Sequence, residues 1–214
     1  MNKILSKIYY GLLNFLLPYG YSYFEYYYQG FQRNYGLKSE IINVGKERKN
    51  LSRFKLQNKN KNTKYLQIWS IKQKLKSLNT EKYQFIDIGS GWGSTLIYFN
   101  HYLNFKKMIG IENQNKFVDT SKKIIRKNNL NKIKIIKKNA VKFKWKENSI
   151  VFINLPDKEI INKMFEFNAT NILKKKNIVI VVNHESSEFF KRKKLLKNYR
   201  LINCSLLRYY IFLN

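Results

Sequence analysis

Residues 85–96 read FIDIGSGWGSTL and carry the strongest structural signal in this chain of 214 residues. A short apolar strand leads into three glycines at alternate positions, Gly89, Gly91 and Gly93, and then into a predicted helix. Glycines permit a tight turn and let a ligand approach the backbone, while the start of a helix offers free N–H groups. The stretch therefore predicts a nucleotide-like cofactor at the C-terminal end of the first strand.

The spacing of the glycines distinguishes two kinds of cofactor. The dinucleotide fingerprint G-x-G-x-x-G needs its third small residue five positions after Gly89, at Ser94, whereas the third glycine is Gly93. Asp87 lies two positions before the first glycine, where a carboxylate would repel a pyrophosphate but could accept hydrogen bonds from an aminoacyl group. The pattern D-x-G-x-G-x-G therefore favours S-adenosylmethionine (SAM), which carries no phosphate.

From residue 84 onwards, short apolar segments alternate with segments of helical periodicity. This alternation predicts a parallel sheet covered by helices on both faces. Strands are expected at Phe85–Ile88, Met108–Glu112, Ile133–Ile136, Ile150–Asn154, Ile178–Asn183, Arg200–Cys204 and Leu207–Phe212. Helices are expected at Ser94–Tyr102, Lys116–Lys127, Lys158–Phe167 and Glu188–Leu196. Because almost nothing separates the last two strands, we expect them to form an antiparallel hairpin. The expected fold is therefore an α/β, Rossmann-like doubly wound sheet, mostly parallel, with a C-terminal antiparallel hairpin.

The glycine turn in this setting resembles that of the class I SAM-dependent methyltransferases, and the resemblance covers about residues 64–214. It implies that the turn surrounds the methionyl part of SAM and that the acid before the turn lies beside it. The residues that map to this part of the cofactor site are Asp87, Gly89, Ser90, Gly91 and Gly93.

Two further strand ends supply the other cofactor contacts that the resemblance implies. Glu112 maps to the acid that holds the ribose hydroxyls, and its place 19 residues after Gly93 also suits a carboxylate on a ribose. The alternative for Glu112 is an acid in a surface loop. Asn139 and Ala140 map to the pair that brackets the adenine, where the family more commonly has Asp first, and an Asn amide can also bond the adenine edge.

The fourth predicted strand ends with the sequence VFINLPD, residues 151–157. The resemblance places its end near the transferred methyl group, with Asn154 and Pro156 as candidate catalytic residues. Relatives that methylate amino groups of nucleobases or glutamine often show Asn/Asp-Pro-Pro and then an aromatic residue, whereas this chain has Leu155 and Asp157 there. Asn154 could hold the nucleophile by a hydrogen bond, and Asp157 could instead be a helix N-cap.

The activity that the resemblance implies is SN2 transfer of the sulfonium methyl group of SAM to an N or O acceptor. A protein or a small molecule is the preferred acceptor, and no metal is implied. The rate would come from aligning the nucleophile and excluding water. Two alternatives stay open: a non-catalytic nucleotide- or nucleic-acid-binding module with this fold, and a methyltransferase that works at a membrane surface.

The sequence predicts two parts. Residues 1–63 form a helical, aromatic extension with a polar linker, and residues 64–214 form the SAM-binding domain. Lys3–Phe15 has helical periodicity, and its apolar run is shorter than the ~20 residues of a membrane span. No small-residue cleavage site follows it, so a cytoplasmic protein is expected. The aromatic segment Tyr21–Tyr28 either packs on the main domain or helps the basic helix to contact an acidic membrane. With the predicted helix Tyr65–Leu78, the extension is the expected lid over the acceptor.

The charge of the chain is strongly positive, with 42 Lys+Arg against 13 Asp+Glu and a net charge of +29. Such an excess can displace counterions from phosphates. However, 35 of the cations are Lys, and the chain also has 27 Asn, which fits a codon bias toward A and T. Recognition surfaces usually favour Arg. A nucleic-acid partner is therefore not favoured, unless the charge clusters around the pocket mouth or the N-terminal helix.

The remaining features set bounds on the fold and on the site. An apolar content of 44% excludes wholesale disorder, and one cysteine excludes a disulfide framework or a zinc cluster of cysteines. We expect His101 to interact with a helix C-terminus and Trp92 either to shape the pocket or to pack between strand and helix. The lesser candidates are the loop residues His184 and Glu185, the core thiol Cys204 and the basic run Lys191–Lys194.

Overall fold

The computed structural model describes residues 31, 34–36, 65–155, 157–174, 177–182, 196, 199–204 and 209–213. Several sequence-based predictions lie outside these residues: the helix Lys3–Phe15, the aromatic segment Tyr21–Tyr28, and all of the helix Glu188–Leu196 except its last residue. No helix among the described residues is long and apolar enough to cross a membrane.

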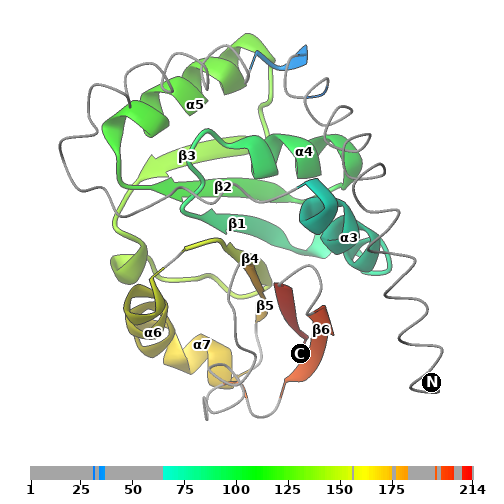
Figure 1. Cartoon of the computed structure of the whole chain (residues 1–214), viewed down its shortest axis with the longest axis vertical. Coiled ribbons are helices and arrows are strands. Elements are labelled where there is room, and N and C mark those ends of the chain that lie inside the picture. The colour runs from blue at the N-terminus through cyan, green and yellow to red at the C-terminus, as the bar shows by residue number, and fades with distance from the viewer. Residues whose placement is uncertain are drawn as a thin grey trace, which may run out of the picture.

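A single seven-stranded sheet forms the centre of the described molecule (Figure 1). Its strands are β1 (Gln84–Ile88), β2 (Lys107–Glu112), β3 (Ile133–Lys137), β4 (Ser149–Ile153), β5 (Asn177–Val182), β6 (Arg200–Cys204) and β7 (Tyr209–Leu213). The helices are α3 (Tyr65–Leu75), α4 (Ser94–Tyr102), α5 (Asn115–Lys127), α6 (Lys158–Phe167) and α7 (Ala169–Leu173), with short 3-10 turns η1 (Thr80–Lys82) and η2 (Ala140–Lys142).

The strands are ordered β3-β2-β1-β4-β5-β7-β6, and the pairs among β1 to β5 are all parallel. The last strand, β7, is antiparallel to both of its neighbours. This confirms the predicted α/β sheet and its C-terminal antiparallel hairpin. Strand β7 inserts between β5 and β6, so that β6 is the edge strand, and this order was not predicted from the sequence.

Two apolar cores cover the two faces of the sheet, and the alternation along β1 shows how they are separated. Phe85 packs with α3, α4 and α5 on one face, whereas Ile86 and Ile88 pack with α6 and α7 on the other. Figure 1 shows α4 and α5 on the opposite side of the sheet from α6 and α7. Helices on both faces leave the strand ends as the accessible edges, which is where a parallel sheet binds ligands.

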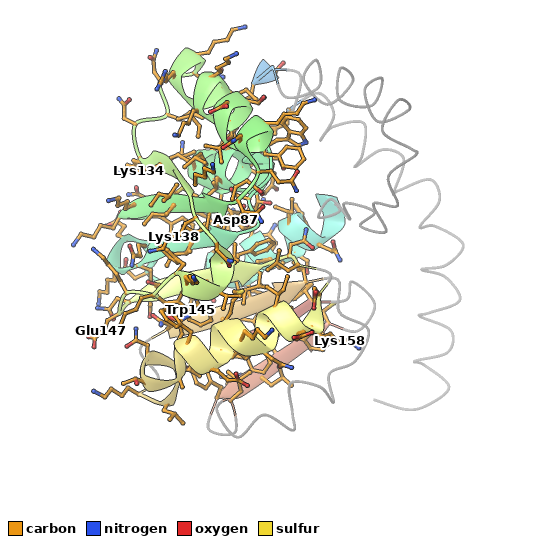
Figure 2. The ribbon with its side chains drawn as sticks, turned by 90° about the vertical axis from the view of Figure 1, so that its left-hand side faces the viewer. Asp87, Lys134, Lys138, Trp145, Glu147 and Lys158 are labelled. Atoms are coloured by element: carbon orange, nitrogen blue, oxygen red, sulfur yellow. The ribbon has the colours of Figure 1, made fainter. Side chains whose placement is uncertain are left out.

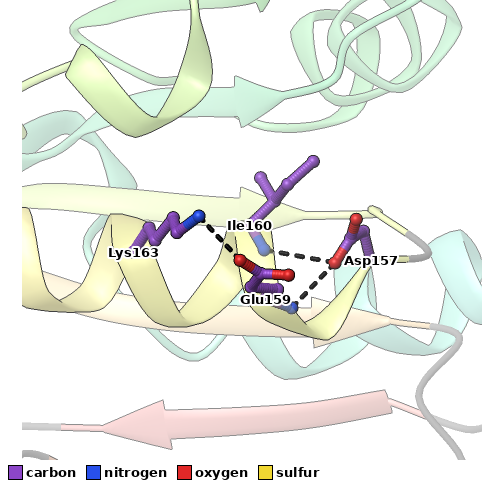
Figure 3. Close-up of polar contacts among 4 residues, drawn as sticks. All are labelled: Asp157, Glu159, Ile160 and Lys163. Atoms are coloured by element: carbon purple, nitrogen blue, oxygen red, sulfur yellow. Dashed lines mark hydrogen bonds and ion pairs between the residues drawn. The ribbon is translucent and has the colours of Figure 1, made fainter.

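The helix boundaries follow local signals in the sequence. Helix α4 begins directly after Gly93, which has a left-handed φ of 78°. Asp157 caps α6, since its Oδ1 accepts hydrogen bonds from the backbone N–H groups of Glu159 at 2.8 Å and Ile160 at 3.2 Å (Figure 3). The N-cap hypothesis for Asp157 is therefore confirmed. One turn later, the Lys163 Nζ lies 2.7 Å from the Glu159 Oε1.

Two elements differ from the sequence-based predictions. Helix α3 ends at Leu75 and not at Leu78, because residues 76–78 form a turn before η1. The short helix α7 was not predicted, since its five residues are too few to show a helical period.

A short N-terminal stretch contacts the last turn of α4. The Phe31 ring lies 5.5 Å from that of Tyr98, and the Tyr35 Oη lies 3.2 Å from the Nδ1 of His101. His101 does lie in the last helical turn, as predicted, and its ring is hydrogen-bonded to the Tyr35 hydroxyl. Because α4 begins at the glycine turn, this contact lies at the end of α4 that faces away from that turn.

Candidate active site

The strand order brings the predicted site residues to one edge of the sheet. The chain leaves β1 for α4 on one face and leaves the adjacent β4 for α6 on the other face. At such a switch point the two connections diverge and leave a crevice at the carboxyl ends of the strands. The glycine turn directly follows β1, and Asn154 directly follows β4. Glu112 ends β2, and Asn139 lies two residues after the end of β3.

The glycine turn folds back toward β2. The backbone N–H groups of Gly89 and Ser90 donate to the carbonyl of Ile111 at 2.9 and 3.1 Å. All three glycines have left-handed φ angles, 77° at Gly89, 51° at Gly91 and 78° at Gly93. Residues with a Cβ adopt this conformation at a cost of roughly 1–2 kcal/mol, so the shape of the turn depends on glycine.

The surroundings of Gly89 and Gly91 differ in a way that matters for ligand binding. A Cβ on Gly89 would lie 2.7 Å from the Cδ2 of Leu155, so this glycine allows the loop after β4 to pack on the turn. A Cβ on Gly91 would meet no atom of a described residue within 4 Å. The backbone at Gly91 therefore borders open space that a ligand can occupy.

Glu112 is the polar centre of the site. Its side chain is only 7% exposed, and its Oε2 accepts a hydrogen bond from the N–H of Gly91 at 3.1 Å. Its Oε1 accepts from the N–H groups of Asn113 at 2.8 Å and Gln114 at 2.9 Å. These contacts argue against the surface-loop alternative for Glu112. The carboxylate joins the glycine turn to the end of β2.

Asp87 lies beneath the turn and has an unusual environment. It is 2% exposed, and its Oδ2, like the buried Oγ of Ser90, has no hydrogen-bond partner among the residues that the structure describes. Burial, and next the nearby charge of Glu112, raise the pKa of the Asp87 carboxyl to about 8. Figure 2 shows Asp87 in the interior of the molecule, away from the surface lysines.

The predicted adenine pair begins the 3-10 turn η2. Asn139 is exposed, and its Oδ1 accepts the N–H of Val141 at 2.9 Å, so that its amide NH₂ is the group that can face a ligand. Ala140 is half-buried and packs against the core on the α6 face.

The two described residues after β4, Asn154 and Leu155, are both half-buried. Leu155 packs on the α6-side core and approaches Gly89, so it forms an apolar wall beside the turn. Pro156, the other candidate catalytic residue, lies outside the described residues.

Of the lesser candidates, Trp92 and Cys204 are described, and neither joins the site. The Trp92 ring is buried and lies 4.6 Å from the Phe117 ring, so it packs between the turn and α5. Cys204 is half-buried against the core on the α4 face. The pair His184 and Glu185 and the run Lys191–Lys194 lie outside the described residues. Within the described part of the chain, no three His, Cys, Asp or Glu residues are grouped as metal ligands would be.

One residue that supports the site was not singled out in the sequence analysis. A Cβ on Gly110 would lie 2.6 Å from the Cδ1 of Ile135, 2.7 Å from the Oγ of Ser90 and 2.8 Å from the Cδ1 of Leu96. Gly110 therefore lets the glycine turn lie close against β2. The available signal was an isolated glycine inside a strand, which often marks a close approach of another segment.

Comparisons with known proteins agree with this geometry. A family model described as a methyltransferase domain matches residues 79–206. A search of curated proteins gave no significant match. Solved structures with a similar fold include a proposed caffeoyl-CoA O-methyltransferase from Staphylococcus aureus, with a TM-score of 0.53 and 17% identity over 80% of this chain and 90% of that one.

Two further structures show the same fold. A proposed rRNA methylase from Clostridium thermocellum has a TM-score of 0.52 and 13% identity, over 69% of this chain and 96% of that one. TrmK from M. capricolum, solved with S-adenosyl-homocysteine, has a TM-score of 0.50 and 16% identity, over 66% of each chain. The present chain thus spans about two thirds of TrmK. Since the family model covers more than half of the sequence, the chain belongs to the methyltransferase-domain family, and its resemblance to the class I SAM-dependent enzymes is confirmed.

Proposed function

We propose that this chain binds SAM in the glycine turn and transfers its methyl group to a nitrogen or oxygen atom of an acceptor. The observation that carries the proposal is the hydrogen bond from the Gly91 N–H to the buried carboxylate of Glu112. It joins the end of β2 to a turn whose central glycine borders open space. SAM is the cofactor that the family implies.

The chemistry of the donor and acceptor groups fits SAM better than a dinucleotide. The ionisable groups described at the turn are the carboxyl groups of Asp87 and Glu112, and the Glu112 carboxylate would repel a pyrophosphate. SAM carries a sulfonium and an ammonium cation and no phosphate. The buried Asp87 Oδ2 and Ser90 Oγ have no hydrogen-bond partner among the described residues, so both can pair with a bound ligand.

Glu112 is suited to hold two adjacent hydroxyl groups. An ionised carboxylate has about four lone-pair sites, and the three backbone N–H groups of the protein leave capacity on its oxygens. Those same N–H groups fix the orientation of the carboxylate before a ligand arrives. We assign to Glu112 the role of ribose acceptor, and to the Asn139 amide the adenine edge.

Asp87 provides a countercharge that responds to the ligand. Its pKa of about 8 keeps much of the free protein in the neutral form near pH 7. A cation beside this carboxyl favours the ionised form and lowers its pKa. The binding of a cationic methionyl group is therefore coupled to the release of a proton from Asp87.

The acceptor side lies at the end of β4. When bound, SAM supplies an activated methyl group on a positively charged sulfur. The amide oxygen of Asn154 can accept a hydrogen bond from an N–H or O–H nucleophile. This bond would hold the lone pair of the nucleophile in line with the methyl group. Leu155 presents apolar surface beside the turn and excludes water from it.

A pair of glycine substitutions tests the cofactor site. Gly91 and Gly36 both have left-handed φ angles and open space where a Cβ would project, but only Gly91 lies at the site. Gly91→Ala and Gly36→Ala should each lower the free energy of unfolding by roughly 1 kcal/mol, while only Gly91→Ala should weaken SAM binding, by more than about tenfold in calorimetry. Absence of SAM binding by the unmodified chain, or equal affinity in both variants, would overturn the proposal.

A further inference from the structure

The positive charge of the described molecule is concentrated in one stretch of the chain. Residues 121–146, the basic segment, contain eleven Lys or Arg residues and no Asp or Glu. The rest of the described chain contains eleven Lys or Arg residues and eight Asp or Glu residues. The eleven are Lys122, Lys123, Arg126, Lys127, Lys132, Lys134, Lys137, Lys138, Lys142, Lys144 and Lys146.

The fold places the basic segment along one edge of the molecule. It comprises the second half of α5, the edge strand β3, the turn η2 and the connection back to β4. Figure 2 looks onto this side, with Lys134 near the start of β3 and Lys138 just after its end. Lys138 directly precedes Asn139, so the basic edge extends from the far end of the sheet to the cofactor edge.

The backbone of this edge is held firmly while its cations point outward. In the connection to β4, Phe143 and Trp145 pack inward, whereas Lys144 and Lys146 are exposed. Asn168 holds this connection, since its Oδ1 accepts the Trp145 N–H at 2.7 Å and its Nδ2 donates to the Phe143 carbonyl at 3.2 Å. The lysines are thus presented from an ordered surface.

The cations of the basic segment are not neutralised by the described part of the protein. Ten of the eleven are exposed, and none pairs with a carboxylate of a described residue. Lys132 donates to the amide oxygen of Asn104 at 2.6 Å, which leaves its charge uncompensated. Lysines on an edge strand can serve to prevent strand pairing, but this role concerns only Lys134 and Lys137 of β3.

We infer that the basic segment binds the phosphodiester backbone of a nucleic-acid strand, and that this strand carries the methyl acceptor. The inference rests on the proposed function for its second part. Closely spaced, uncompensated cations bind polyphosphates by releasing counterions. An acidic membrane would also attract them, but interfacial binding needs apolar side chains at the same surface. The exposed large apolar residues of the described chain, Tyr102, Ile160, Phe167 and Leu173, all lie outside the basic segment.

This inference departs from the sequence-based preference for a protein or small-molecule acceptor. That preference rested on the excess of Lys over Arg, which fits a codon bias, and left a role for the charge only if it clusters around the pocket mouth or the N-terminal helix. A codon bias does not by itself explain why eleven of the 22 Lys and Arg residues of the described chain lie in 26 successive residues that form one edge of the fold.

The test compares two fourfold variants of the full chain with the same change in charge. The edge variant replaces Lys134, Lys142, Lys144 and Lys146 with Gln, and the control variant replaces Lys74, Lys76, Lys82 and Lys174, which are exposed outside the basic segment. Fluorescence anisotropy would measure binding to a labelled 20-nucleotide RNA and to DNA of the same sequence, over a series of NaCl concentrations. Sedimentation with phosphatidylserine vesicles would measure membrane binding, and calorimetry would measure SAM binding.

The edge variant should bind the oligonucleotide at least tenfold more weakly near 0.1 M salt, and its salt slope should fall by about 3, at about 0.7 for each lost phosphate contact. The control should stay within about twofold of the unmodified chain. Equal losses in both variants, or losses in vesicle binding only, would overturn the inference. Failure of the chain to bind SAM would instead overturn the proposed function, which the oligonucleotide data do not measure.

Discussion

Two regions of this molecule carry ionisable groups in opposite settings: the buried carboxyl pair beneath the glycine turn, and the exposed basic segment along β3. Asp87 and Glu112 are almost entirely removed from water, and Glu112 is held by three backbone N–H groups. The basic segment has eleven cations, nearly all in solvent. Buried charges interact strongly and with defined partners, whereas exposed charges are screened within about 10 Å at 0.1 M salt.

The difference indicates that specificity comes from the buried carboxyl pair and that long-range attraction comes from the exposed basic segment. One substitution in the carboxyl pair should change the recognition of a small cofactor. One substitution in the basic segment should change little, because attraction to a polyanion is a collective property of many cations. The expected effects therefore decrease from the buried region to the exposed one.

The largest effect is expected from Glu112→Gln. A glutamine amide has only one acceptor oxygen, so at least one of the three backbone N–H groups would face another donor. Loss of charge-assisted hydrogen bonds of about 1.5–3 kcal/mol corresponds to a loss of SAM affinity of roughly 10- to 100-fold. Calorimetry measures it, with the exposed Glu166→Gln as the matched control, and unchanged affinity in Glu112→Gln would contradict the assigned role.

The second effect is a pH dependence that comes from Asp87. Burial raises its pKa from an unfolded value of 3.8 to about 8, so the folded state binds the proton more tightly than the unfolded state does. This contribution to stability is therefore present below pH 4 and is lost as the pH rises toward 8. In Asp87→Asn the contribution disappears, and the Tm of the variant relative to the unmodified chain should increase steadily from pH 5 to pH 8.

Thermal unfolding in matched buffers checks this prediction. Asp119→Asn, a substitution at an exposed position, controls for the loss of a carboxylate as such. A difference in Tm that is independent of pH in Asp87→Asn would show that this carboxyl is not buried as the structure has it.

A third, smaller effect concerns an exposed aspartate. Asp157 accepts the N–H groups of Glu159 and Ile160 at the start of α6. Asp157→Ala removes the cap and should lower the free energy of unfolding by about 1 kcal/mol, while Asp157→Asn should retain most of it, since Asn also caps helices. Urea unfolding distinguishes the two variants, and equal losses in both would argue against the cap.

The smallest effect is expected for a single lysine of the basic segment. Lys144→Gln removes one of eleven cations and no hydrogen bond that fixes the backbone. Oligonucleotide affinity at 0.1 M salt should fall by no more than about threefold, with a decrease in salt slope of about 0.7. A tenfold loss from this one change would mean that the segment holds a specific site and not a collective surface.

Elements with strong local signals were predicted well from the sequence. The strand before Gly89 and the helix from Ser94 to Tyr102 were located because glycines and an apolar run mark them unambiguously. Strands β2 to β5 were placed to within one residue at each end. The antiparallel hairpin followed from the short connection between its strands.

Features that depend on contacts between distant segments could not be predicted. The insertion of β7 between β5 and β6 depends on which strands pair with each other, and local periodicity does not determine that pairing. The need for Gly110 arises from Ser90, Leu96 and Ile135, which converge on it only in the folded chain. Likewise, the lysines of residues 121–146 are visible in the sequence, but their common edge requires the knowledge that β3 ends the sheet.

The most direct test of the central claim is to follow the glycine turn while SAM binds. The chain has only nine glycines, so a sample labelled with ¹⁵N-glycine gives a simple amide spectrum. On addition of SAM, the amide signals of Gly89, Gly91 and Gly93 should shift, while that of Gly36, at the far end of α4, should stay unchanged. Saturable SAM binding that leaves the three turn signals in place would contradict the account.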